Sequence, residues 1–159
     1  MSISEIFDHG TPHPWANLRI NNLTIDGSLN IPNESGTLLI TFGGAIPSTT
    51  FSVAFQKIGM QVSLNFPNIL SNGAGGVIGP ITAPAGSIPA NLIPQFLGAV
   101  QYNILVKVEN NNVISLNPGL FVISPTGTIN IFLDTTLSSF GVTNTRGSFS
   151  FVTSYASAT

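Results

Sequence analysis

The sequence predicts an all-β protein, an antiparallel jelly-roll sandwich of about ten strands. Three observations lead to this fold class. Apolar and polar residues alternate with a period of two in many segments. Turn-forming residues separate these segments at intervals of about 8 to 12 residues. No segment longer than about ten residues keeps a helical period free of glycine, proline and β-branched residues, so almost no helix is expected.

Residues 1–35 are predicted to form an extended N-terminal arm. The segment "TPHPW" is stiff because each proline restricts both itself and the residue before it. The following "NLRINNLTIDGSLNIPN" has β character but little to pair with locally. We therefore expect an arm over 1–35 and a sandwich domain over 36–159. The arm would pack on its own sandwich, run along a partner, or anchor the domain to something larger.

The first half of the sandwich contains two clear strand patterns. In "TFSVAF" the apolar residues Phe51, Val53 and Phe55 share one face. In "QVSLNF" the residues at 62, 64 and 66 do the same, and Gln, Ser and Asn occupy the opposite face. Each segment is therefore predicted to be a half-buried strand.

The stretch from Asn72 to Pro94 contains no charged residue, no histidine and no aromatic residue. Proline cannot donate to a central ladder, so the four prolines of this stretch predict a loop or an irregular edge strand; they are Pro80, Pro84, Pro89 and Pro94. "GAGGVIG" is followed by proline instead of a helix, so it indicates a tight crossing between strands and not a phosphate loop. We expect the apolar side chains of this stretch to lack partners within one domain and to be covered by other copies of the chain; they are Ile78, Ile81, Ile88, Leu92 and Ile93.

The second half begins with the best hairpin pattern of the chain. "QYNILVKVE" alternates, "NNN" supplies residues that tolerate positive φ, and "VISL" returns. The segments "GLFVI", "TINIFL" and "SFSFVTSY" follow, separated by "SPTG" and by glycine and asparagine between 141 and 147. These segments supply the remaining strands of the predicted sandwich.

Charged residues make up only 6% of the chain, against about 25% in an ordinary soluble domain. The four basic residues are scattered, which excludes the clustered positive surface that nucleic acid requires. No apolar run reaches the roughly 18 residues of a membrane span, and the N-terminus lacks the features of a secretory signal. The absence of cysteine fits synthesis in a reducing compartment. We expect much of the surface to be covered by protein.

Catalytic and metal-binding patterns are weak. Glu109 and Asp134 could meet across a sheet, but acids in turns are common and the pair is not taken as catalytic. His9 and His13 lie beside Asp8 in the N-terminal segment, where prolines prevent the helix that would align them on a metal. The sequence predicts no enzyme, no cofactor and no metal site.

Two resemblances add to this interpretation. The closing segment "GSFSFVTSYASAT" resembles the last strand of the tumour necrosis factor and complement globular-head jelly rolls, which form trimers around that strand. "HPWANLRINNLTIDGSLNIPN" is similar to N-terminal segments of small β-rich virion proteins of marseillevirus-type giant viruses, noumeavirus among them. Together they imply a virion-associated trimer made in a host cytoplasm. The receptor-binding loops of the cytokine family have no match here, so receptor binding is not implied.

The prediction is a non-enzymatic structural or interaction protein that forms a homotrimer in a virion, with the arm contacting other virion proteins. The candidate residues for the trimer interface or the core are Tyr102, Phe149, Phe151 and Tyr155. The alternative is a carbohydrate- or receptor-binding module on a particle or cell surface, in which Trp15 and the tyrosines stack on sugar.

Overall fold

The computed structural model describes residues 31–70, 78–95, 101–141 and 147–157. The predicted arm, with Trp15 and both histidines, lies outside the described residues apart from its last five positions, as does most of "GAGGVIG". The first strand begins at Asn33, inside the range assigned to the arm. The division into arm and domain stays a prediction.

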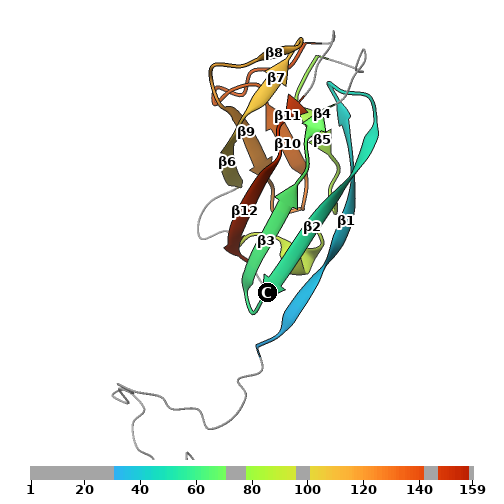
Figure 1. Ribbon diagram of the computed structural model, residues 1–159, viewed down its shortest axis with the longest axis vertical. Helices are drawn as coiled ribbons and strands as arrows, with labels where there is room; N and C mark the ends of the chain where they lie inside the picture. The colour runs from blue at the N-terminus through green and yellow to red at the C-terminus, as the bar shows by residue number, and fades with distance from the viewer. Residues whose placement is uncertain (1–30, 71–77, 96–100, 142–146, 158–159) are drawn as a thin grey trace, which may run out of the picture. The chain divides into compact units, whose positions relative to one another are not determined.

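The described residues form twelve strands and one short 3₁₀ turn, shown in Figure 1. This agrees with the all-β prediction. The first seven elements are β1 (Asn33–Gly44), β2 (Thr49–Ile58), β3 (Gln61–Phe66), β4 (Ile69–Leu70), β5 (Ile81–Ala83), η2 (Ala90–Leu92) and β6 (Tyr102–Val106). The others are β7 (Val108–Asn110), β8 (Val113–Ile114), β9 (Gly119–Ile123), β10 (Ile129–Phe132), β11 (Gly147–Ser148) and β12 (Phe151–Ala156).

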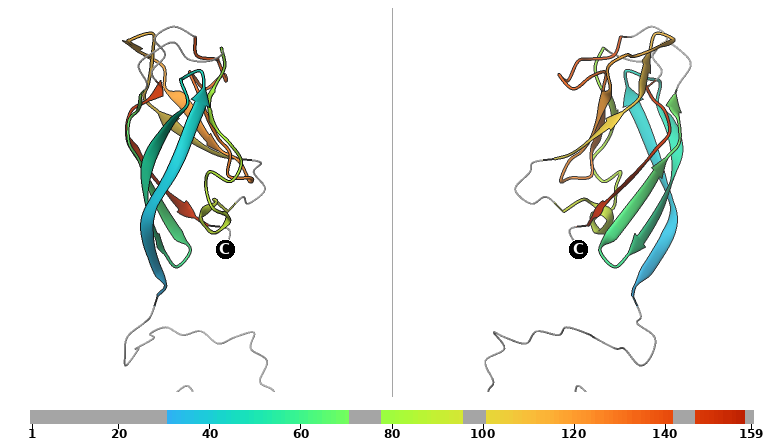
Figure 2. Two further views of the ribbon diagram at one scale, coloured as in Figure 1. Left: turned by 90° about the vertical axis from the view of Figure 1, so that its right-hand side faces the viewer. Right: turned by 60° about the vertical axis from the view of Figure 1, so that its left-hand side comes forward.

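Eight strands form one hydrogen-bonded antiparallel series in the order β12-β3-β2-β1-β5-β10-β9-β6. The series folds over at β1, so that β12-β3-β2-β1 forms one layer and β5-β10-β9-β6 the other (Figures 1 and 2). β1 belongs to both layers because its residues 33–42 pair with β2 and its last two glycines pair with β5. A smaller sheet, β4-β11-β7-β8, covers one end of the sandwich.

The core lies between the two layers, where the apolar phase of each alternating strand meets the other layer. In β3 the inward residues at 62, 64 and 66 are fully buried, as predicted. The core of the first layer also contains Ile40, Phe42, Val53 and Tyr155. The second layer contributes Ile81, Ala83, Val106, Phe121, Ile123, Ile129 and Ile131.

The predicted hairpin after residue 101 is present, with one difference. Asn111 and Asn112 both have positive φ, 52° and 60°, as a two-residue type I′ turn requires between β7 and β8. The alternating segment before them divides at Lys107 into β6 and β7, which belong to different sheets. Its side-chain alternation continues across the division, since Val106 and Val108 are both buried.

Among the described residues, no helix has the length and apolarity needed to cross a bilayer. The same residues contain no group of three or more His, Cys, Asp or Glu side chains that could hold a metal ion.

Candidate assembly surface

Three of the four candidate residues belong to two aromatic groups where the two layers close. Tyr102 comes from β6, and Phe151 and Tyr155 come from β12, the two end strands of the folded series. The rings of Tyr102 and Tyr155 lie edge to face with centroids 5.1 Å apart. The Phe151 ring stacks on Phe66 and meets the edge of Phe121, each at 4.9 Å. We call these two groups the aromatic seam.

Hydrogen bonds fasten the two tyrosines of the seam. The Tyr155 hydroxyl donates to the Leu92 carbonyl at 2.8 Å. Burial raises the pKa of Tyr155, and the neighbouring Tyr102 adds to this effect, so the hydroxyl stays a protonated donor. The Tyr102 hydroxyl donates to the Ser154 carbonyl at 3.3 Å and lies 3.2 Å from the Thr153 hydroxyl. The seam therefore ties β6 and η2 to β12 within one copy.

Phe149 lies apart from the seam. It precedes β12, its N–H donates to the Lys107 carbonyl at 3.0 Å, and the Lys107 ammonium lies 5.0 Å from the centre of its ring. Of the four residues, Tyr155 belongs to the buried core, and Tyr102 and Phe151 pack against that core while half-buried. A contact of any of the four with another copy stays a prediction.

The described part of the uncharged stretch, residues 78–94, packs largely into the core of its own copy, whereas the sequence predicts that its apolar side chains need cover from other copies. Ile81, Ile88 and Leu92 are at most 1% exposed, and Ile93 packs against the core of the same copy. Ile78 is the one of the five candidates that stays open, at 70% exposed. The expectation that this set needs other copies as cover was therefore wrong for four of its five members.

The reason for this difference lies in β5 and in the loop that follows it. Pro80 and Pro84 flank a three-residue strand that pairs with β1 on one side and β10 on the other, so the segment is inside the series and not at its edge. The loop then folds back over the core, fastened by the N–H groups of Gly86 and Ile88, which donate to Thr126 and Gly127 carbonyls. These contacts bury side chains that show no periodic pattern in sequence.

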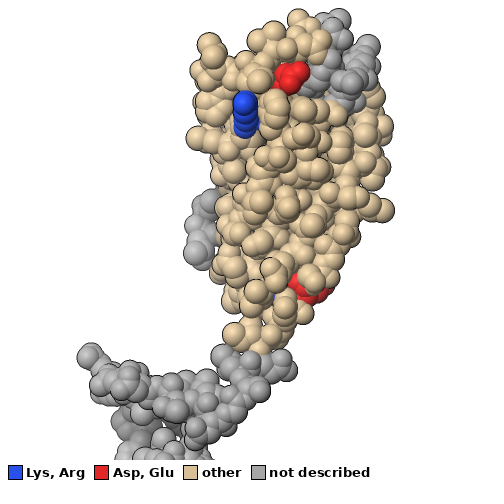
Figure 3. Space-filling model, in the orientation of Figure 1, with Lys and Arg blue, Asp and Glu red and all other residues tan. Residues whose placement is uncertain are grey.

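The outer face of the β12-β3-β2-β1 layer is uncharged at every outward position. We call it the outer face, and its residues are Asn33, Ser35, Thr37, Leu39, Thr41, Thr50, Ser52, Ala54, Gln56, Ile58, Gln61, Ser63, Asn65, Val152, Ser154 and Ala156. All except the half-buried Ser63 are exposed. Figure 3 looks onto this face, and its middle shows neither blue nor red atoms.

The charged residues of these strands fall in the opposite phase of the alternation. Glu34 and Lys57 pair across β1 and β2, one step away from the outward positions. The Lys57 ammonium donates to the Asn91 carbonyl at 2.8 Å, and the Asn91 amide donates to Glu34 at 3.3 Å. These ions fasten the η2 turn to the β1–β2 hairpin and leave the outer face neutral.

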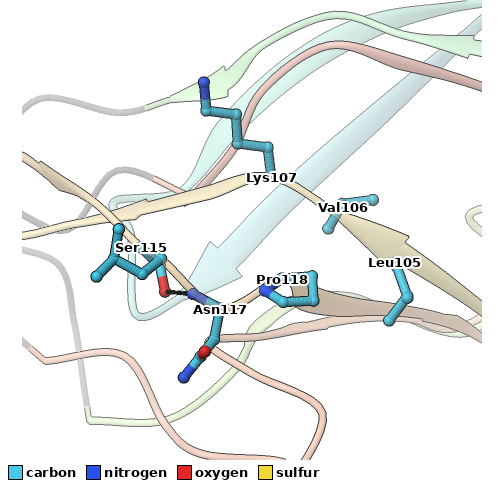
Figure 4. Close-up of a pocket in the computed structure, with 7 residues that line it drawn as sticks. Leu105, Val106, Lys107, Ser115, Asn117 and Pro118 are labelled. Atoms are coloured by element: carbon cyan, nitrogen blue, oxygen red, sulfur yellow. Dashed lines mark hydrogen bonds between the residues drawn. The ribbon is translucent and has the colours of Figure 1, made fainter.

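A shallow cavity of about 300 Å³ lies between β6 and the segment that follows β8 (Figure 4). Its lining residues are Leu105, Val106, Lys107, Ser115, Leu116, Asn117 and Pro118. Figure 4 shows the Lys107 side chain directed away from Asn117 and Pro118, and the Asn117 N–H donates to the Ser115 hydroxyl at 3.2 Å. This lining includes no carboxylate or imidazole for acid–base chemistry and no aromatic ring on which a sugar would stack.

The two acids weighed for catalysis have separate places. Glu109 lies in β7, opposite Ile114 and Gly147. Asp134 follows β10, and its carboxylate accepts hydrogen bonds from Thr136 and Ser138. Neither lines the cavity of Figure 4.

Comparison with known proteins gives one similar viral sequence. No family model matches the chain. Over 114 residues it is 29% identical to structural protein V8 of Sputnik virophage, in a match that covers 71% of this chain and 60% of V8. The chain is similar to a viral structural protein. It spans about three fifths of the length of that relative, and the likeness to marseillevirus-type proteins stays a prediction.

Among solved structures, the chain is similar to the reovirus attachment protein sigma1, determined in complex with alpha-2,3-sialyllactose. The TM-score is 0.45 at 12% sequence identity, and the match covers 81% of this chain and 67% of the other.

The sequence predicts the seam residues only as candidates for the interface or the core, and it does not point to the outer face. The signal was present in the polar half of each strand, where Ser, Thr, Asn and Gln replace the usual Lys and Glu. Only strand order and register show that these positions from β1, β2, β3 and β12 lie side by side.

Proposed function

We propose that this protein is a non-enzymatic structural component of a virus particle, and that it assembles as a homotrimer. The observation that carries the proposal is the uncharged outer face, because a solvated surface ordinarily depends on charged side chains for its solubility. The similarity to structural protein V8 supports the viral and structural parts of the proposal.

The proposal also assigns roles to the two parts of the chain. Residues 36–159 supply the jelly-roll domain and the contacts between copies. Residues 1–35 supply the arm that contacts other proteins of the particle. Synthesis in the host cytoplasm is consistent with a chain that has no cysteine.

Two measurements test the proposal. Size-exclusion chromatography with light scattering is expected to give the mass of three chains of 16.6 kDa each. Mass spectrometry of purified particles is expected to find the protein after surface proteins of the host have been removed. A stable monomer that is absent from particles would contradict the proposal.

A further inference from the structure

We propose that the outer face of the β12-β3-β2-β1 layer is a docking surface for a second copy of this chain. This inference deepens the proposed function and rests on its claim of self-assembly. It identifies the contact surface, which neither the comparisons nor the sequence assigned.

The first argument is the cost of removing water. Burying an ion without a partner is expensive, and burying an ion pair often gains little. No residue of the outer face carries a charge, and Glu34 and Lys57 occupy the opposite phase of their strands. A neighbouring copy can therefore cover these residues without desolvating a charge that the face itself carries.

The second argument concerns the hydroxyl groups of the face. The Thr41 and Thr50 hydroxyls lie 2.7 Å apart across β1 and β2, and the Ser63 and Ser154 hydroxyls lie 2.7 Å apart across β3 and β12. Since each pair already shares a hydrogen bond within the sheet, fewer polar groups lose a partner when the face is covered.

The third argument is the exposed apolar area. Leu39 on β1 is 73% exposed and Val152 on β12 is 66% exposed. Of the two strands between them, β2 presents Ser52 and Ala54 outward, and β3 presents Ser63 and Asn65. Two apolar side chains thus flank a strip of short, uncharged side chains, against which another sheet face can pack at about 10 Å.

The size of the face agrees with a protein contact. Four strands about 4.8 Å apart span roughly 19 Å, and nine residues of β1 at about 3.3 Å each span roughly 30 Å. Allowing for the shorter β3 and β12, the face offers about 500 Å². In a closed trimer it meets a different surface of the neighbouring copy, so each contact buries about 1,000 Å² in total, the lower limit of a specific interface. A second copy is the occupant that this neutral, flat surface fits.

Charge substitutions on the face test the inference. Leu39→Lys and Ala54→Glu change exposed side chains, so the fold is expected to persist by circular dichroism while light scattering shows loss of the oligomer. Leu116→Lys is the matched control, because Leu116 is 102% exposed away from this face. The control is expected to remain assembled.

The outcomes separate this inference from the proposed function. A monomeric wild-type protein would contradict self-assembly itself. A wild-type oligomer that survives both face substitutions, or that dissociates equally with Leu116→Lys, would overturn the assignment of the face while self-assembly stands.

A cysteine probe gives a second measurement that does not depend on charge. Because the chain has no cysteine, Ser52→Cys introduces a single thiol in the face and Leu116→Cys a single thiol elsewhere. In the assembled protein the thiol at 52 is expected to react with a maleimide about tenfold or more slowly than the thiol at 116. Equal rates would refute the inference. Protection in a monomer would mean that residues 1–30 of the same chain cover the face, which refutes it equally.

Discussion

At the scale of single residues, Asp134 shows how one carboxylate holds a turn. One of its oxygens accepts from the Thr136 N–H at 2.9 Å, the Thr136 hydroxyl at 2.7 Å and the Ser138 N–H at 3.1 Å. Leu137, in the same turn, has a φ of 65°, which non-glycine residues rarely adopt. The hydrogen bonds to the carboxylate therefore stabilise a backbone that the sequence alone does not favour.

This carboxylate predicts a dependence of stability on pH. Hydrogen bonds from Thr136 and Ser138 lower the pKa of Asp134 from 3.8 to about 2. Because the folded pKa lies below the unfolded one, the contribution is present above pH 3.8 and disappears as the pH falls through about 2. In Asp134→Asn this contribution is absent. The difference in urea midpoint between wild type and variant is therefore expected to shrink across this range, and parallel pH profiles would contradict the prediction.

At the scale of elements, β1 joins the two layers of the sandwich. Its pairing passes from β2 to β5 at Gly43 and Gly44. Gly44 has a φ of 80°, and a Cβ atom placed on it would lie 2.5 Å from the Pro80 carbonyl oxygen. Gly43 has no other atom within 4 Å of such a Cβ position. The passage of β1 from one layer to the other therefore requires glycine at position 44 but not at position 43.

Alanine substitutions distinguish the two positions. Gly44→Ala is expected to lower the free energy of unfolding by more than about 1 kcal/mol, because it combines an unfavourable φ with a backbone clash. Gly43→Ala is the matched control and is expected to change that free energy by less than about 0.5 kcal/mol. Urea denaturation followed by circular dichroism measures both. Similar losses for the two variants would show that the crossing does not require the conformation at Gly44.

At the scale of the whole molecule, the alternating strands were predictable and the irregular segments were not. Residues 51–55, 61–66 and 102–108 alternate, and their apolar phase faces the core. In residues 81–93 the buried side chains follow no period, because burial there comes from contacts with β1, β10 and the loop at Thr126. The proline content of residues 81–93 predicts a surface segment, whereas in the structure this segment buries side chains in the core.

The residues of the candidate assembly surface were likewise predictable only in part. Tyr102, Phe149, Phe151 and Tyr155 are predicted only as interface or core residues, without a face assigned to each. In the structure Tyr155 lies in the core, and Tyr102 and Phe151 pack against it. The outer face needed the register of four strands, which spans residues 33 to 156. Such long-range pairing has no local signal in the sequence.

Because few side chains of this chain are charged, we can predict how the assembly responds to salt. With a neutral contact surface, 1 M sodium chloride is expected to leave the dissociation constant within about threefold of its low-salt value. Ammonium sulfate is expected to strengthen the assembly, because excluded salts favour burial of apolar surface. Light scattering on dilution measures both effects. A weakening of about tenfold in sodium chloride would indicate that ion pairs hold the copies together.

The pairing of β1 also bears on how the domain resists mechanical force. A pull on the chain before Asn33 acts along β1, whose antiparallel ladder with β2 runs from Asn33 to Phe42. When the domain is held at its opposite end, such tension loads the ladder in shear, so its hydrogen bonds share the load instead of opening one after another. A domain tethered through its N-terminal side would therefore tolerate strain on the tether before its first strand detaches.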